Sequence, residues 1–414
     1  MKIDHAESAV VASTGADAAA QDTAQNGRRT FLKHAAGGIT ALAAAGWPQL
    51  QTNAAETDGP QYIYTGSFTT KERGARGVGI GVYRVEQSGG AWTPVQALET
   101  VANPQFICMD RTQRFLYSVH GDGTEVSAYA IDRASGRIAF LNKQATNGVN
   151  STHLTPDPGN RYLVIGNGPG VAVFPMREDG SLAPFSDMVP STGELGPQLT
   201  QQREGAHPHF VVFDPGGRFL VACDRGTDRL LVYKLNPANG KLTAHEPPFV
   251  RNRAGAGPRH LAFHPTQPWA YVCNELDSTV TAYQWNGELG EFKPFQIVPA
   301  APMNYTGNNS PAEIMAAPSG KFIYVSNRGH DSIAIYAVDP GSGNLGPIGW
   351  ESTRGKTPRF FTLAADGAML YAANLASHNI VAYRVDQATG RLTATGQVIE
   401  TGSPSCIVFR SASA

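Results

Sequence analysis

A unit of roughly 50 residues is repeated seven times between Gln61 and Arg410, and this repeat constrains the fold more than any other feature of the chain. In each copy an aromatic residue closes an apolar run: Tyr83, Tyr129, Phe174, Tyr233, Tyr283, Tyr336 and Tyr383. A polar residue ends another apolar run in each copy: Ser67, His120, Asn167, Asp224, Asn274, Asn327 and Asn374. Repeats of this length that hold several short apolar runs are typical of a β-propeller.

Residues 311–350 show how one repeat is built. A run that opens at Pro311 is followed by a turn at 318–321, a buried strand at 322–326 and a third strand at 332–338. A turn at 339–343 then leads into an outer strand. Short apolar runs between Gly, Pro, Asn and Asp clusters indicate strands. We therefore expect four antiparallel strands in each blade.

The two ends of the repeat region predict how the ring closes. The first repeat lacks the opening Pro-led strand, whereas the chain finishes with an unpartnered one at 404–410. If this last strand joins the first blade, seven blades are complete and no sheet edge stays open at the junction. The predicted fold is an all-β, seven-bladed propeller.

The first 56 residues differ from the rest of the chain. Arg28 and Arg29 precede a weakly apolar stretch from Ala35 to Trp47, which resembles a twin-arginine export signal. That stretch is too short to span a membrane. We expect residues 1–56 to be a signal and linker, 57–414 to form the propeller, and the folded protein to be exported to the periplasm by the twin-arginine machinery. An ordinary disordered N-terminus is the alternative.

Charge and cysteine content exclude some classes of partner. The formal net charge is −1 and no Lys/Arg cluster is present, which argues against a nucleic-acid surface. The four cysteines fall in strands of different repeats without C-x-x-C spacing, as expected for buried core residues. We predict neither a metal nor a cofactor.

The antiparallel pairing places two sets of residues at one mouth of the ring. The second residues of the opening strands are Gln105, Thr152, His209, Arg259, Ala312, Arg359 and Ser405, and the residues after the polar markers are Phe68, Gly121, Gly168, Arg225, Glu275, Arg328 and Leu375. Antiparallel neighbours bring both sets to the same end. The ionisable members all come from four consecutive blades, which a purely structural role, repeated in every blade, does not explain.

Several arginines at one mouth indicate an anionic ligand, because guanidinium groups bind carboxylate or phosphate through a planar fork. Arg225 and Arg359 are candidates for substrate binding, with Asp224, Asn274 and Asn327 alongside. The alternative is that the arginines pair with neighbouring aspartates and cross-link the blades.

Acid–base candidates lie among the arginines. His207 and His209 would share one face of a strand. We expect His209 to act as an acid or base and His207 to bind substrate, although a His-x-His pair can also hold a metal. Glu275 is a candidate base that activates water, with a charge-balancing ion pair as the alternative. His260 is expected to pack within its strand.

At these residues the chain resembles the lactonase-type family of seven-bladed propellers, which includes a bacterial 6-phosphogluconolactonase and the fungal 3-carboxy-cis,cis-muconate lactonizing enzyme. The similar segments are 257–265 (GPRHLAFHP), 274–278 (NELDS), 326–331 (SNRGHD), 357–360 (TPRF) and 213–218 (FDPGGR) behind His209. The resemblance covers about residues 61–410.

The resemblance implies a metal-free hydrolase or cycloisomerase acting on lactones of acidic small molecules, with His209, Arg259, Glu275 and Arg328 as active-site residues. An exported setting favours an unphosphorylated sugar lactone over a phosphorylated one. The competing expectation is a non-enzymatic exported propeller that binds an anionic ligand.

Overall fold

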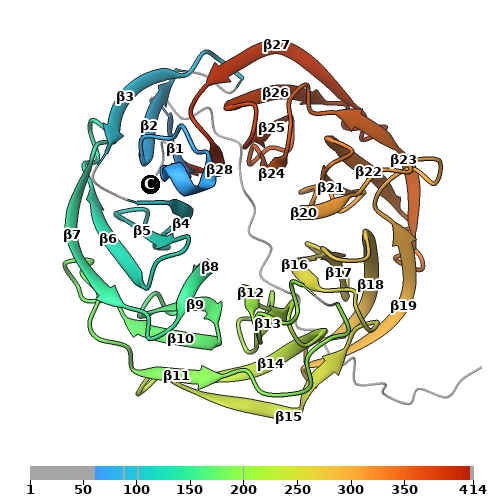
Figure 1. Cartoon of the computed structure of the whole chain (residues 1–414), viewed down its shortest axis with the longest axis horizontal. Coiled ribbons are helices and arrows are strands. Elements are labelled where there is room, and N and C mark those ends of the chain that lie inside the picture. Colours follow the sequence, from blue (N-terminus) through green and yellow to red (C-terminus); the bar gives the residue numbers. More distant parts are fainter. Residues whose placement is uncertain (1–60, 87–88, 100–101, 199, 411–414) are drawn as a thin grey trace, which may run out of the picture. The chain divides into compact units, whose positions relative to one another are not determined.

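The computed structural model describes residues 61–86, 89–99, 102–198 and 200–410. The predicted export signal lies outside these residues. Within the compact unit Ala54–Ala414, seven four-stranded antiparallel sheets follow one another around a ring (Figure 1). The predicted all-β, seven-bladed fold is confirmed. The single helical element among the described residues is the short 3-10 turn η1 (Lys71–Arg73).

The strands of each blade run from the innermost to the outermost position in chain order, apart from the first blade (Figure 1). The first blade contains β28 (Pro404–Arg410), β1 (Gln61–Ser67), β2 (Ile80–Val85) and β3 (Thr93–Leu98). The second contains β4 (Pro104–Met109), β5 (Phe115–His120), β6 (Glu125–Ile131) and β7 (Ile138–Ala145). The third contains β8 (Val149–Pro156), β9 (Tyr162–Gly168), β10 (Gly170–Pro175) and β11 (Asp187–Pro190).

The remaining four blades repeat this order. The fourth contains β12 (Pro208–Phe213), β13 (Leu220–Asp224), β14 (Arg229–Asn236) and β15 (Lys241–Arg251). The fifth contains β16 (Pro258–Phe263), β17 (Trp269–Asn274), β18 (Thr279–Asn286) and β19 (Glu291–Pro299). The sixth contains β20 (Ser310–Ala316), β21 (Phe322–Arg328), β22 (Ser332–Val338) and β23 (Leu345–Ser352). The seventh contains β24 (Pro358–Leu363), β25 (Met369–Asn374), β26 (Asn379–Val385) and β27 (Leu392–Glu400).

The C-terminal strand closes the ring, as the sequence predicted. Strand β28 pairs antiparallel with β1, with Tyr62 opposite Arg410 and Thr65 opposite Ile407. The Arg410 side chain also donates hydrogen bonds to the carbonyls of Gln113 and Arg133 in the second blade. The two ends of the repeat region are therefore joined by backbone hydrogen bonds, which leaves no open edge on β1.

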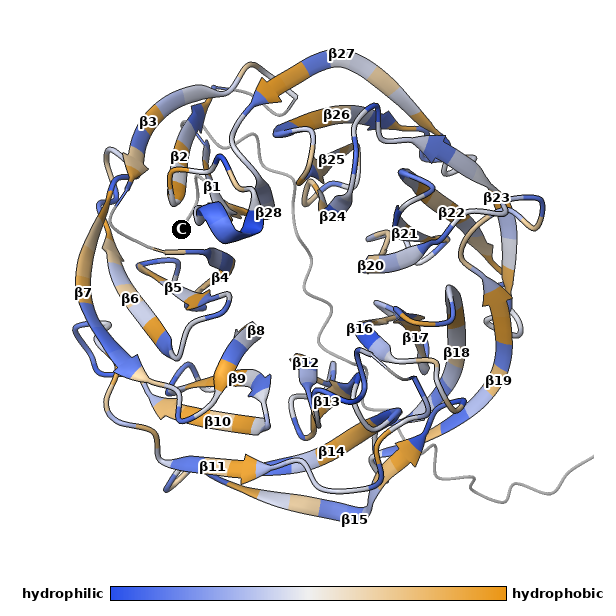
Figure 2. Cartoon of the chain, in the orientation of Figure 1, coloured by the Kyte–Doolittle hydropathy of each residue, from blue (hydrophilic) through white to orange (hydrophobic). Residues whose placement is uncertain are grey.

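Apolar residues recur along the strands of every blade (Figure 2), and they form the core between neighbouring sheets. Buried tyrosines also connect one blade to the next. The hydroxyls of Tyr117, Tyr271 and Tyr324 donate to backbone carbonyls in the next blade at 2.9–3.0 Å. Because a buried tyrosine hydroxyl needs a partner, each of these bonds fixes the spacing of two adjacent sheets.

Every inner strand departs from regular pairing near its first residues. In β4, β12, β16 and β24 the pairing skips one residue, which is Gln105, His209, Arg259 and Arg359 respectively. The pairing is also irregular in β8, β20 and β28 at the corresponding level. A β-bulge re-aims the side chain of its extra residue, and such bulges are common beside active sites. The mouth positions that lie on the inner strands therefore coincide with these irregularities in the pairing.

Candidate active site

Glu275 is the centre of a buried charge cluster at one end of the inner strands. It directly follows β17, and its backbone N–H donates to the Gly257 carbonyl at 2.8 Å. Gly257 has a φ of 61°, and a Cβ there would lie 2.5 Å from Cγ of Leu276. Only glycine fits this close approach, so the loop before β16 fixes the position of Glu275.

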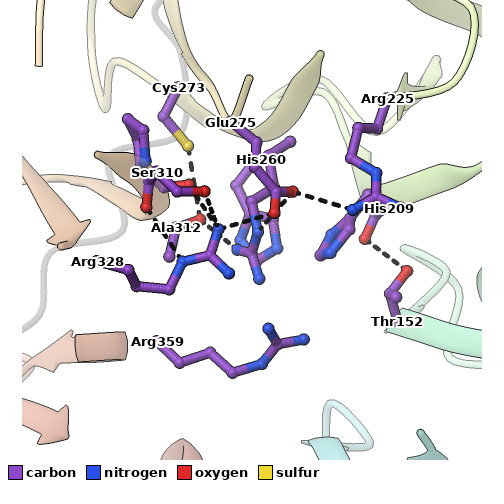
Figure 3. A network of polar contacts seen from close by, with 12 residues as sticks. Thr152, His209, Arg225, His260, Cys273, Glu275, Ser310, Ala312, Arg328 and Arg359 are labelled. Atoms are coloured by element: carbon purple, nitrogen blue, oxygen red, sulfur yellow. Dashed lines mark hydrogen bonds and ion pairs between the residues drawn. The ribbon is translucent and has the colours of Figure 1, made fainter. Parts of the chain in front are cut away.

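Three arginines surround the Glu275 carboxylate (Figure 3). Oε1 lies 2.9 Å from Nη2 of Arg328, and Oε2 lies 3.5 Å from both Nη1 of Arg225 and Nε of Arg259. The Glu275 side chain is only 7% exposed and that of Arg259 only 3%. The structure therefore brings together four of the residues that the repeat placed at one mouth.

Backbone carbonyls of the sixth blade hold two of these guanidinium groups in place. Arg259 donates from Nη1 to the Ala312 carbonyl. Arg328 donates from Nε to the Ser310 carbonyl at 3.1 Å and from Nη2 to the Pro311 carbonyl at 3.2 Å. These bonds orient the guanidinium planes before any ligand binds, which lowers the cost of ordering them.

Arg359 adds a fourth cation beside this cluster (Figure 3). Its Nη2 donates to Oε1 of Gln105 at 3.1 Å, and its guanidinium lies 5.3 Å from the centre of the Phe68 ring. Among the described residues no carboxylate forms an ion pair with it. Burial, together with the guanidiniums of Arg259 and Arg328, lowers the pKa of Arg359. The cluster therefore has more cations than carboxylates.

The arginines make Glu275 a weak base. Burial raises the pKa of Glu275, but the charges of Arg328, Arg225 and Arg259 lower it by more, so the net shift is strongly downward. A carboxylate with so low a pKa stays ionised and has little tendency to take a proton from water. The structure thus favours the ion-pair alternative for Glu275 over the predicted role as a base.

His207 and His209 lie next to the arginines with their rings stacked, 5.7 Å apart at an interplanar angle of 22°. Burial, followed by nearby guanidiniums, lowers the pKa of His207 to about 3 and that of His209 well below its usual value. Both imidazoles are therefore neutral near pH 7. Nε2 of His207 and Nδ1 of His209 are buried without a hydrogen-bond partner. The unpaired nitrogens of these neutral imidazoles can accept or donate a hydrogen bond, depending on the tautomer.

Three residues predicted to bind substrate have other partners. Asp224 accepts the backbone N–H groups of His207 and Gly226 through Oδ1 at 2.8 and 2.9 Å, and the Ser191 hydroxyl through Oδ2. These bonds connect the loop before β12 to the end of β13. They favour a structural role for Asp224.

Asn274 and Asn327 are fully buried and similarly engaged. Asn274 donates to the hydroxyls of Thr279 and Thr281, each at 2.9 Å. Asn327 donates to the Ala300 carbonyl at 2.7 Å and accepts from Nδ2 of Asn309 at 2.9 Å. We therefore assign both to loop anchoring, and Arg225, Arg359 and His207 remain the candidates for substrate contact.

Sequence reasoning missed a second acidic group near the site. His260, which was expected only to pack in its strand, has its Nδ1 3.1 Å from Oε2 of Glu313. Both side chains are almost completely buried. The sequence pointed to this group only through Glu313 itself, a single carboxylate on an inner strand directly after the mouth position Ala312.

The described residues contain no group of three or more His, Cys, Asp or Glu side chains arranged to hold a metal ion. The four cysteines are all unpaired thiols. None of the helical segments in the described part of the chain has the length and apolar character needed to span a membrane.

Comparison with known proteins agrees with this geometry. The family model described as "Lactonase, 7-bladed beta-propeller" matches residues 62–409. The 6-phosphogluconolactonase of Bacillus subtilis is 38% identical over 309 residues, which cover 73% of this chain and 84% of that protein. The 6-phosphogluconolactonase of Formosa agariphila is 30% identical over 314 residues, which cover 73% of this chain and 86% of that protein.

Among solved structures, the periplasmic gluconolactonase of Pseudomonas aeruginosa has a TM-score of 0.78 and 30% sequence identity, and the match covers 85% of this chain and 99% of that one. The fold, the extent of the family match and these relatives all indicate the same family. The chain belongs to the lactonase family of seven-bladed β-propellers, and its relatives named 6-phosphogluconolactonase are lactone-hydrolysing carboxylic-ester hydrolases.

Proposed function

We propose that the protein hydrolyses a sugar lactone at the arginine cluster, without a metal ion. The observation that carries this proposal is the imbalance of charge: three guanidiniums surround the Glu275 carboxylate, and the guanidinium of Arg359, which has no carboxylate partner among the described residues, and a neutral imidazole lie beside them. Lactone hydrolysis places negative charge on the former carbonyl oxygen, and the product is itself a carboxylate. An excess of fixed cations stabilises both.

In this mechanism His209 accepts a proton from the attacking water. Arg259 and Arg328 stabilise the oxyanion that forms on the ring carbonyl, since their guanidiniums are already oriented by backbone carbonyls. Arg225 and Arg359 contact hydroxyl or acidic groups of the substrate, with His207 alongside. Glu275 keeps the three guanidiniums together and takes no proton.

The proposed substrate class is a gluconolactone-like sugar lactone. Relatives named 6-phosphogluconolactonase and a neighbour named periplasmic gluconolactonase support this class. We further propose that the protein is exported through the twin-arginine signal around Arg28 and Arg29 and that its substrate is unphosphorylated. Replacing both arginines by lysine should keep the full chain in the cytoplasm, as measured by cell fractionation. Undiminished periplasmic protein would contradict the export proposal.

The test of activity is acid release by the full chain, offered glucono-1,5-lactone and its 6-phosphate in the presence of EDTA. We expect release above the spontaneous rate, and a loss of about 100-fold in kcat for Arg259→Lys, because a lysine cannot reproduce the guanidinium fork at the oxyanion. Absence of release from every lactone offered would contradict the proposal. Acid release that occurs without EDTA but is lost when EDTA is added would show that a metal takes part.

A further inference from the structure

One residue beyond the mouth positions of the inner strands, side chains from six blades pack together inside the ring. These side chains are Phe106, His153, Phe210, His260, Phe360 and Glu313, which we call the channel floor. Phe106 of the second blade lies 6.2 Å from the His260 ring of the fifth and 5.6 Å from the Phe360 ring of the seventh. Rings from blades that are not neighbours touch here. The floor therefore separates the arginine cluster from the other half of the channel.

Glu313 is the one carboxyl group of this floor. It is 3% exposed, and Oε1 accepts the Ile314 backbone N–H at 3.1 Å while Oε2 contacts Nδ1 of His260. Glu313 also lines a cavity of about 450 Å³, together with residues further along β16 and β20, and none of the four arginines lines this cavity. Burying an acid among aromatic rings costs free energy unless its oxygens have a full set of partners. Buried acids of this kind are therefore often found at functional sites.

His260 connects this acid to the site. Its Nδ1 faces Glu313, whereas its Nε2 is buried without a partner, and so is Nδ1 of the neighbouring His209. The two ring centres are 5.2 Å apart. Two imidazoles joined by an N–H···N bond of about 3 Å have their centres about 5 Å apart, so a reorientation of the rings alone can join these nitrogens.

The arginines create a problem that this arrangement solves. A proton taken up by His209 makes an imidazolium beside Arg259 and Arg225, and their charges, after burial, lower the pKa of His209. Glu275 cannot neutralise that imidazolium, because its charge is balanced by three guanidiniums. Burial raises the pKa of Glu313 to about 8, although Arg259 partly opposes the shift. Its carboxylate is therefore a much better proton acceptor than that of Glu275.

We propose that Glu313 is the terminal proton acceptor of the reaction and that His260 and His209 relay the proton to it from the attacking water. This inference rests on the proposed lactonase function. Glu313 and His260 act through His209 and do not touch the substrate, so they are positioning residues.

The proton and charge balance as follows. Water loses its proton to one nitrogen of His209 as its oxygen bonds to the ring carbonyl, and His209 gives the proton on its other nitrogen to His260. His260 passes its Nδ1 proton to the Glu313 carboxylate, so no imidazolium remains beside the arginines. When the intermediate collapses and the ring C–O bond breaks, the same path returns a proton to the leaving alkoxide. The product is a hydroxy acid, and Glu313 is again ionised.

The relay predicts a specific pH dependence. Only ionised Glu313 can accept a proton, and its ionised fraction falls about tenfold for each pH unit below its pKa. The titratable or charged groups that face Glu313 and His260 are Arg259, Cys273, His153, His209, Arg328 and Arg359. Burial lowers the pKa of both facing histidines, which stay neutral above pH 6, and burial raises that of the thiol to about 12. The kcat of the wild-type protein should therefore rise from pH 6 to about pH 8 and then level off.

The test compares kcat and KM for glucono-1,5-lactone between pH 6 and 8.5, after subtraction of the spontaneous rate, for three full-length proteins. Glu313→Gln keeps the size and the hydrogen bond to His260 but cannot take a proton. We expect its kcat at pH 8 to fall about 100-fold, with KM within about twofold and no rise with pH. His153→Phe is the matched control. It replaces another buried imidazole of the floor by phenylalanine, the residue found at the same level in the second and fourth blades as Phe106 and Phe210.

The control should keep the pH profile of the wild-type protein even if its Tm falls. A Glu313→Gln protein that retains both the wild-type kcat and the rise with pH would overturn the relay. So would a flat kcat in the wild-type protein, a result that needs no variant to fold. No turnover by the wild-type protein at any pH would instead refute the lactonase function on which the relay rests.

Discussion

Replacing Glu275 by glutamine should destabilise the protein and create an anion site in the same step. The change removes one negative charge and keeps the shape of the side chain. Three guanidinium nitrogens, at 2.9, 3.5 and 3.5 Å in the wild-type protein, then face one another without a carboxylate. These groups are mostly buried, so water screens them poorly.

The magnitude follows from these distances. At an effective dielectric constant of about 20, each contact corresponds to about 5 kcal/mol of attraction. Much of this attraction offsets the cost of desolvating the four groups, and removing one partner of a buried ion pair typically costs about 3–5 kcal/mol. We expect the free energy of unfolding to fall by that amount, which corresponds to a decrease in Tm of about 4–7 °C for a propeller of about 350 residues.

Thermal unfolding with and without sulfate measures both effects. Sulfate can occupy the place of the lost carboxylate, and at about 100 times its Kd it should restore about 2.7 kcal/mol. Glu204→Gln is the matched control, because Glu204 also lies 3.5 Å from Arg225 but its side chain is 67% exposed. That variant should lose less than about 1 kcal/mol.

The reasoning would be refuted by a Glu275→Gln protein with the wild-type Tm and no added response to sulfate. Such a result would mean that water or other groups already balance the guanidiniums. Equal losses in the Glu275 and Glu204 variants would show that burial does not control the strength of these pairs.

Two further predictions concern the residues that position the site. Asn274→Ala should lower the free energy of unfolding by about 1–3 kcal/mol, because the hydroxyls of Thr279 and Thr281 and the amide of Asn252 each lose one hydrogen bond, while KM for the lactone stays unchanged. An increased KM would return Asn274 to the substrate-binding groups. Deleting residues 404–410 should expose the edge of β1 and the core beneath it. We expect rapid proteolysis of this variant and no cooperative unfolding transition by circular dichroism. A stable variant that unfolds cooperatively would contradict the closure role of β28.

The fold could be predicted because the repeat is expressed locally. Each blade carries its own apolar runs, turn residues and terminal polar marker, so periodicity along the chain reports strand number and order. The closing role of β28 followed from counting strands, since one strand was missing at the start and one was left over at the end. Strand polarity alone then brought Arg225, Arg259, Glu275 and Arg328 to one mouth.

The roles of the site residues could not be predicted in the same way. Asp224, Asn274 and Asn327 lie beside the arginines in the sequence pattern, yet loops from elsewhere in their own blade or the preceding blade supply partners for their polar atoms. The base strength of Glu275 depends on how many guanidiniums surround it, and these come from three different blades.

Glu313 shows most clearly what could not be predicted from the sequence. In the sequence it is one acidic residue on an apolar strand, with no neighbour that marks it. Its contact with His260, the 5.2 Å between the rings of His260 and His209, and its raised pKa all arise where inner strands from separate blades meet. Sequence by itself therefore determined the ring and which residues reach its mouth, because hydrogen-bond register is local. Only the tertiary structure decided which of them are bases, ion pairs or anchors, because charge and burial depend on neighbours that lie far apart in the chain.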